Sequence, residues 1–142
     1  MAFLDLRYFS AALQKQTAAW VLYPDAGTAP FATLYLLHGL SDDHTIWLRR
    51  TALERYVANL PLIVVMPDGG RGFYCDAREG YAYGSAVATE LVDRIDAMFP
   101  TRRDAAARFV CGLSMGGYGA FRLALSHPER FGAAASLSGA LA

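Results

Sequence analysis

A serine flanked by glycines stands where the chain changes from the pattern of a strand to that of a helix. ARFVCG (107–112) is short and apolar, which predicts a buried strand, and MGGYGAFRLALSHP (115–128) has a helical pattern that ends before Pro128. Between them, Gly112-Leu113-Ser114-Met115-Gly116 fits G-x-S-x-G, a sharp strand-to-helix turn that exposes the serine hydroxyl. The chain must therefore fold so that a strand end and a helix N-terminus meet at Ser114.

This position is typical of a nucleophile. Backbone N–H groups and the dipole at a helix N-terminus favour the negative charge that develops when a serine attacks a carbonyl. Gly112 and Gly116 let the chain turn sharply and keep side chains away from Ser114, and Gly117 follows them. The alternative is a serine that only caps the helix, but a cap does not explain glycines on both sides. We therefore predict that Ser114 is the catalytic nucleophile.

The rest of the chain alternates between strand-like and helix-like segments. Residues 3–9 and 16–23 predict a β-hairpin, which the prolines and glycine of 24–30 bring to an end. From residue 31 onward, apolar runs alternate with helical patterns, which predicts a mostly parallel sheet with helices on both faces. The expected strands lie within 31–39, 60–70, 107–112 and 131–139, and the expected helices within 49–58, 84–99 and 115–128.

The domain expected from these segments is a single α/β unit covering residues 1–142, with an N-terminal hairpin at 1–23 and a parallel α/β core at 31–142. Its last strand is followed by no helix that could cover it. We therefore expect the N-terminal part of a larger sheet that lacks its last strands. A hydrophobic content of 54% agrees with apolar surface that is meant for something outside this chain.

The charges exclude two classes of partner. Thirteen basic and thirteen acidic residues cancel and are interspersed, so no basic surface is expected to recruit nucleic acid or an anionic membrane. The N-terminus has no basic segment followed by an apolar run, and no apolar stretch is long enough to span a bilayer. We expect a soluble, cytoplasmic protein.

The segment HGLSDDH (38–44) follows the first strand of the expected parallel sheet. In this architecture the oxyanion hole takes one N–H from the residue after the nucleophile and one from the loop after an earlier strand. Those donors would be Met115 and Leu40, with His38 and Gly39 shaping the loop. The histidines and aspartates of this segment also suggest a metal site, but their spacing does not bring several ligands onto one ion. We expect neither a metal nor a cofactor.

Three longer stretches carry a resemblance to a known family: LYLLHGLSDDHTIWLRRT (34–51), ERYVANLPLIVVMPDGGRGFYCD (54–76) and GLSMGGYGAFRLALSHPERF (112–131). In these the chain resembles the putative-esterase (esterase D-like) family of the α/β-hydrolase superfamily and is similar to tributyrin-type short-chain esterases. The resemblance implies an α/β-hydrolase fold and no cofactor. It also implies that Ser114 is the nucleophile.

The same resemblance implies roles for further residues. Leu40 and Met115 would donate to the oxyanion, and Trp47 and Tyr74 would be candidate walls of the substrate pocket. For these two aromatic side chains, ordinary packing is an equally open alternative. The family's order of nucleophile, acid and histidine places the last two beyond the strands that these 142 residues contain.

None of the three histidines is a convincing base for Ser114. His127 lies thirteen residues further along the helix, roughly 20 Å away at about 1.5 Å per residue, where it would instead interact with the helix C-terminus. His38 is expected to shape the oxyanion loop through its ring. His44 is the one local candidate for a makeshift base. The aspartates near these segments are expected to form turns or to lie on the surface; they are Asp42, Asp43, Asp68 and Asp76.

The expected activity is hydrolysis of short-chain acyl esters, with a small-molecule ester as substrate. Without the acid and histidine of a triad, these residues alone would be nearly inactive, since removing a triad member costs on the order of a million-fold in kcat. Two alternatives remain open: a thioesterase similar to S-formylglutathione hydrolases, and a non-catalytic binding or assembly partner. A homo-oligomer is also left open.

Overall fold

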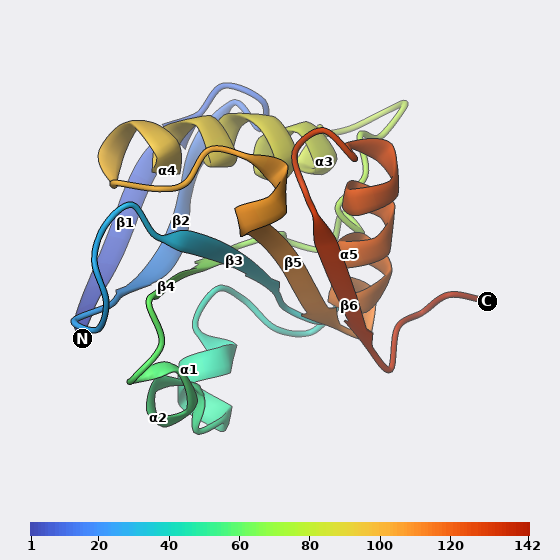
Figure 1. Ribbon diagram of the computed structural model, residues 1–142. Coiled ribbons are helices and arrows are strands. Elements are labelled where there is room, and N and C mark those ends of the chain that lie inside the picture. Colours follow the sequence, from blue (N-terminus) through green and yellow to red (C-terminus); the bar gives the residue numbers. More distant parts are fainter.

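The computed structural model describes all residues from 1 to 142 and contains one six-stranded sheet with the strand order β1-β2-β4-β3-β5-β6 (Figure 1). The predicted strands are all present, with their ends shifted by a few residues at most. Their bounds are β1 (Ala2–Ser10), β2 (Lys15–Tyr23), β3 (Ala32–Leu37), β4 (Leu62–Pro67), β5 (Arg108–Leu113) and β6 (Ala133–Leu137).

The sheet joins an antiparallel hairpin to a parallel core. β1 and β2 pair over their whole length, which confirms the predicted hairpin. β3 pairs in parallel with β4 and with β5, and β5 pairs in parallel with β6, which confirms the parallel core. The two parts meet where β2 runs antiparallel to β4, with Ala19 opposite Pro67.

The prediction of one continuous helix at 49–58 is wrong. The structure has two short helices there, α1 (Ile46–Arg50) and α2 (Leu53–Val57), separated by an extended Thr51 with φ −133° and ψ 171°. The Thr51 hydroxyl donates to the carbonyl of Trp47 and accepts a hydrogen bond from the N–H of Leu53 at 3.2 Å. These local bonds compete with the helical pattern and end α1.

The helix predicted at 84–99 is present, with an irregular middle. It consists of α3 (Tyr83–Ser85), a π-helical segment η1 (Ala86–Leu91) and α4 (Val92–Met98), and it ends at the extended Phe99 before Pro100. Because a π-helical turn holds more residues than an α-helical turn, the buried face rotates along the helix. Val92 joins the core, whereas Met98 is exposed.

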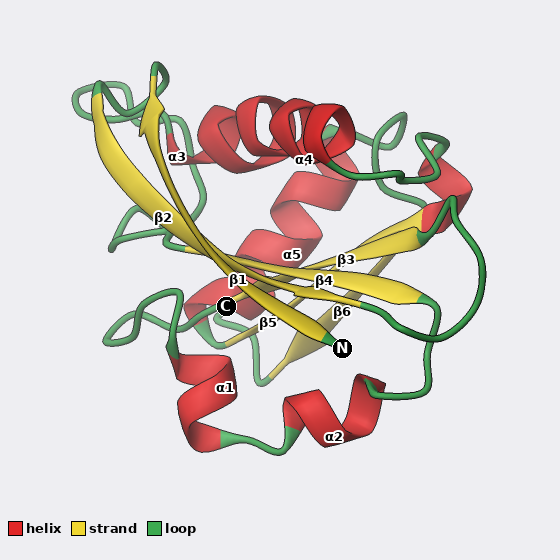
Figure 2. Cartoon of the chain, turned by 90° about the vertical axis from the view of Figure 1, so that its left-hand side faces the viewer, coloured by secondary structure: helices red, strands yellow, loops and turns green.

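Helices cover both faces of the sheet, as predicted. α3, η1 and α4 lie with α5 (Met115–Ser126) on one face, and α1 and α2 lie on the other (Figure 2). The larger core forms under α4 and α5, and a smaller cluster under α2 includes Leu53 and Val57. A short 3-10 turn, η2 (Ala105–Ala107), leads into β5. No helix combines the length and apolar character that crossing a membrane requires.

Candidate active site

Ser114 lies at the junction of β5 and α5, exposed to solvent, as the sequence predicts. Its backbone has φ 54° and ψ −112°, a conformation that non-glycine residues rarely adopt and that is found where surrounding structure enforces it. The Ser114 side chain makes no capping hydrogen bond to α5. The alternative of a simple helix cap therefore has no contact to support it.

The glycines around Ser114 allow backbones to approach one another closely. A Cβ on Gly112 would overlap with the backbone of Gly116, and a Cβ on Gly116 would lie 2.7 Å from the carbonyl oxygen of His38. The start of α5 thus packs directly against the end of β3. Gly117 faces the chain after β6, where its Cβ would lie 2.8 Å from the Cα of Gly139.

The loop after β3 lies beside Ser114. A Cβ built on Gly39 would be 3.8 Å from the Cβ of Ser114. The N–H of Leu40 has no backbone or side-chain acceptor, and Met115, as the first residue of α5, has no intrahelical acceptor for its N–H. Two unused donors therefore flank the serine, and the oxyanion hole predicted from Leu40 and Met115 remains compatible with the geometry.

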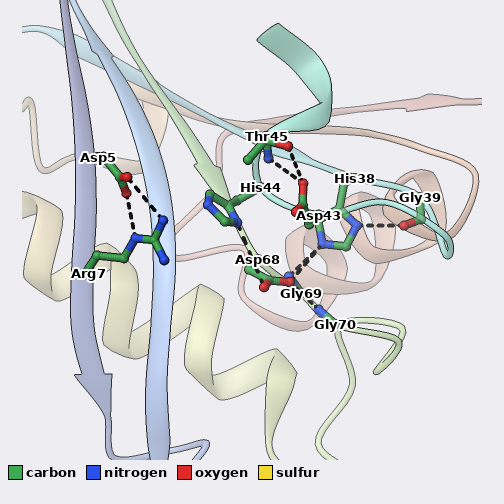
Figure 3. Close-up of polar contacts among 10 residues, drawn as sticks. All are labelled: Asp5, Arg7, His38, Gly39, Asp43, His44, Thr45, Asp68, Gly69 and Gly70. Carbon is green, nitrogen blue, oxygen red and sulfur yellow. Dashed lines mark hydrogen bonds and ion pairs between the residues drawn. The ribbon is translucent and has the colours of Figure 1, made fainter. Parts of the chain in front are cut away.

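His38 is buried and holds this loop in place (Figure 3). Its Nε2 accepts a hydrogen bond from the N–H of Gly69 at 2.8 Å, and its Nδ1 lies 2.7 Å from the carbonyl oxygen of Gly39. Because an amide N–H can only donate, Nε2 must be unprotonated and Nδ1 must carry the hydrogen that it donates to Gly39. The neutral ring therefore connects the loop after β3 with the loop after β4 through its two nitrogens.

Asp68 lies between the two histidines at the end of β4. Its Oδ1 is 3.5 Å from Nε2 of His38, and its Oδ2 is 4.0 Å from Nδ1 of His44. A hydrogen bond from His38 would lower the pKa of Asp68 most, and the N–H of Gly70, donating to Oδ1 at 2.9 Å, lowers it as well. Because Nε2 of His38 accepts the N–H of Gly69, it has no hydrogen to donate to Asp68. The hydrogen bond from Gly70 is therefore the one that Asp68 accepts.

His44 is buried rather than placed on an open polar loop. Neither ring nitrogen has a hydrogen-bond partner, and the ring packs edge-on against Trp20 with 5.5 Å between centroids. In Figure 3 it points toward Asp68. The structure shows no contact between His44 and Ser114, so nothing in it supports the role of a makeshift base.

His127 also lies away from Ser114. It is the C-cap of α5, at the opposite end of a twelve-residue helix that begins at Met115, roughly 18 Å long at about 1.5 Å per residue. The expected position at a helix C-terminus is confirmed. No histidine ring among these residues forms a hydrogen bond with Ser114.

The two aromatic candidates for a pocket wall differ in their exposure. Tyr74 is fully buried, and its hydroxyl donates to the carbonyl of His38 at 3.1 Å, so packing accounts for its position. Trp47 is half-buried and lines a cavity of about 70 Å³ together with Gly39 and Leu113. Its role as a wall stays a prediction.

Sequence reasoning missed how the loop after β4 packs against His38. Phe73 and Tyr74 both have φ 52°, a left-handed conformation in two successive non-glycine residues. The Cβ of a residue at position 69 would overlap with the ring of Tyr74, so Gly69 is what allows this loop to pass close to His38. The clue available in the sequence was that His38 and Asp68 both follow parallel strands, whose carboxyl ends meet at one edge of the sheet.

The chain matches known proteins over nearly all of its length. The sequence profile of the family described as "Putative esterase" matches residues 10–142. An acetyl esterase from Caldicellulosiruptor saccharolyticus is 31% identical over an alignment that covers 99% of this chain and 57% of that protein. The chain thus spans little more than half the length of this relative.

Solved structures agree with this assignment. FphF, a fluorophosphonate-binding serine hydrolase of Staphylococcus aureus, superposes with a TM-score of 0.91 at 33% identity, covering 97% of this chain and 57% of that chain. FrmB, an S-formylglutathione hydrolase of Staphylococcus aureus, has a TM-score of 0.87 at 33% identity, again covering 97% of this chain and 57% of that chain. The predicted α/β-hydrolase fold is confirmed, and the chain belongs to the putative esterase family.

Proposed function

We propose that the protein is a serine esterase that hydrolyses short-chain acyl esters through an acyl-enzyme on Ser114. The observation that carries the proposal is the strained, exposed conformation of Ser114 beside the Gly39–Leu40 loop. Membership of the putative esterase family and the similarity to an acetyl esterase support it.

In the proposed mechanism, Oγ of Ser114 attacks the ester carbonyl carbon and the carbonyl oxygen becomes an oxyanion. The N–H groups of Leu40 and Met115 stabilise that charge. A donor of this kind lowers the free energy of the transition state by about 3–4 kcal/mol. The oxyanion then collapses, the C–O bond to the alcohol breaks, and the alcohol takes up the proton that a base removed from Ser114. Water attacks the acyl-enzyme, which releases the carboxylic acid and restores the Ser114 hydroxyl. The base that accepts the Ser114 proton comes from outside these residues in this proposal, since no histidine ring among them forms a hydrogen bond with Ser114.

The test is ester hydrolysis by the natural full-length protein and by its Ser114→Ala variant. With p-nitrophenyl acetate and butyrate as substrates, kcat should fall on the order of 10⁶-fold, to the level of the remaining binding and oxyanion contributions. Ser126→Ala, an exposed serine at the far end of α5, is the matched control. Equal activity of the parent and the Ser114→Ala variant would exclude the proposal.

A thioesterase activity is the second candidate, because FrmB is an S-formylglutathione hydrolase of similar structure. The same nucleophile would attack a thioester carbonyl. Comparing kcat/KM for S-formylglutathione and p-nitrophenyl acetate separates the two, since a thioesterase would prefer the thioester.

A further inference from the structure

A cavity of about 70 Å³ opens between the oxyanion loop and α1. His38 and Gly39 line it on the side of the loop, and Leu113, which directly precedes Ser114, lines it on the side of β5. Gly39 also approaches Ser114 closely, as the 3.8 Å between its built Cβ and the Cβ of Ser114 shows. The residue before Ser114 and the loop beside Ser114 thus both contribute to the cavity.

The wall opposite the serine is formed by α1. Ile46 and Trp47 supply its apolar surface, and Asp42, Arg50 and Thr51 also line the cavity. The Thr51 hydroxyl donates to the Trp47 carbonyl, which fixes the last turn of α1. The indole Nε1 of Trp47 is shielded from solvent and has no acceptor in the structure. Trp47 therefore sits in a fixed helix and keeps one donor unused.

The size of the cavity limits what it can hold. One water-sized group needs about 10–15 Å³ on this measure, so a volume of about 70 Å³ accommodates on the order of five non-hydrogen atoms. An acetyl, propionyl or butyryl group fits this limit. An octanoyl group does not, because the seven carbons beyond its carbonyl exceed this limit.

We propose that this cavity binds the acyl group of the substrate and that Trp47 sets the upper limit of acyl length. The inference rests on the proposed esterase function of Ser114. With the carbonyl carbon at Ser114, the acyl chain passes Gly39 and Leu113 and ends against the indole of Trp47. Each methylene that is buried instead of left in water is worth about fourfold in kcat/KM, and this gain stops where the indole blocks the chain.

The first experiment measures kcat/KM of the natural full-length protein for p-nitrophenyl acetate, butyrate, hexanoate and octanoate. The parent should prefer acetate and butyrate. Trp47→Ala should raise the ratio of octanoate to acetate at least tenfold, whereas Trp47→Phe, which keeps a large apolar side chain, should keep the parent's preference. Tyr56→Ala, an exposed residue on α2 that does not line the cavity, should leave the ratio unchanged. An equal loss with all four esters in Trp47→Ala would overturn the proposal.

The second experiment does not depend on catalysis. Residues 1–142 contain two tryptophans, and the variants Trp20→Phe and Trp47→Phe identify their indole cross-peaks in the ¹H–¹⁵N spectrum of the natural full-length protein. Butyramide, an unreactive analogue of a butyryl ester, should shift the Trp47 peak and not the Trp20 peak, and octanamide should shift it less. If butyramide shifts neither peak, or both equally, the acyl site is wrong. If Ser114→Ala retains full hydrolysis while butyramide still shifts Trp47, the esterase mechanism fails and the acyl site stands.

Discussion

The N–H of Gly69 donates to Nε2 of His38 over 2.8 Å, and this bond joins the loops that follow two neighbouring parallel strands. It fixes the tautomer of a ring whose other nitrogen lies against the carbonyl of Gly39. The position of the Gly39–Leu40 loop beside Ser114 thus depends on a proton that His38 carries on Nδ1.

The tautomer of His38 can be observed directly. We expect long-range ¹H–¹⁵N spectra near neutral pH to show His38 as the neutral ring with hydrogen on Nδ1, because Gly69 occupies Nε2. His38→Phe leaves the buried Gly69 N–H without an acceptor and should reduce the free energy of unfolding by about 1–3 kcal/mol. A ring protonated on Nε2 at neutral pH would contradict the assignment.

Gly116→Ala should strongly destabilise the fold. The added Cβ would overlap with the carbonyl of Leu37 and lie 2.7 Å from that of His38, and neither backbone can move without displacing β3. Overpacking of this kind costs about 1–3 kcal/mol or more, measured as a lower midpoint in urea. Leu125→Ala, on the same helix and 81% exposed, should change stability by about 0.5 kcal/mol at most. Similar midpoints for the two variants would show that α5 does not pack as described.

Two aspartates of α4 form ion pairs that should differ in their contribution to stability. Asp96 pairs with Arg108 at 2.7 Å, with only 14% and 4% of the side chains exposed, whereas Asp93 pairs with Arg130 at 2.9 Å and is 62% exposed. Asp96→Ala leaves a buried guanidinium without its partner and should cost about 3–5 kcal/mol.

Asp93→Ala should cost about 0–1 kcal/mol, since water and salt screen an exposed pair. Both values come from urea unfolding of the two variants under the same conditions. A larger loss in Asp93→Ala than in Asp96→Ala would mean that burial does not decide the contribution of these pairs.

Alkaline titration should reveal three tyrosines that do not ionise with the others. Burial is the main cause that raises the pKa of Tyr8 to about 12 and raises the pKa of Tyr35 and Tyr74. At about pH 11, tyrosinate absorbance of the folded protein should therefore account for at most five of the eight tyrosines.

The same shifts make stability depend on alkaline pH. The folded-state pKa values lie above the unfolded value of about 10, so the stabilisation is complete below about pH 10 and is lost as pH rises toward 12. The urea midpoint should fall in that window. A midpoint that stays constant through it, with all eight tyrosines titrating together, would show that these rings are accessible to water.

The sequence predicted the parts of the site that depend on local pattern. A strand, two glycines and a helix specify the turn at Ser114, because each residue acts on its neighbours. The extended Thr51 between α1 and α2 was missed because a single hydroxyl overrides an otherwise helical pattern. The burial of individual side chains was harder to predict than the ends of the helices. His44 and Tyr74 follow polar or glycine-rich segments that look like exposed loops, but residues far away in the sequence pack against them, Trp20 of β2 against His44 and Gly119 of α5 against Tyr74.

The pairing of β2 with β4 was also beyond prediction. β3 pairs with one edge of β4, so the other edge of β4 is free to pair with β2. Ala19 comes to lie opposite Pro67 because β2 pairs at that free edge. The continuous apolar run of β2, from Ala18 to Tyr23, predicts a buried strand and carries no information about which strand lies beside it.

This pairing has a consequence for how the chain reaches its folded state. The β1–β2 hairpin is local and can form within about 1–10 μs, but it gains a partner only after β3, α1, α2 and β4 have been brought together. Closing that loop costs entropy before the contacts between β2 and β4 repay it. Folding should therefore proceed from the parallel core outward, with the docking of a preformed hairpin onto β4 as a late, rate-determining step.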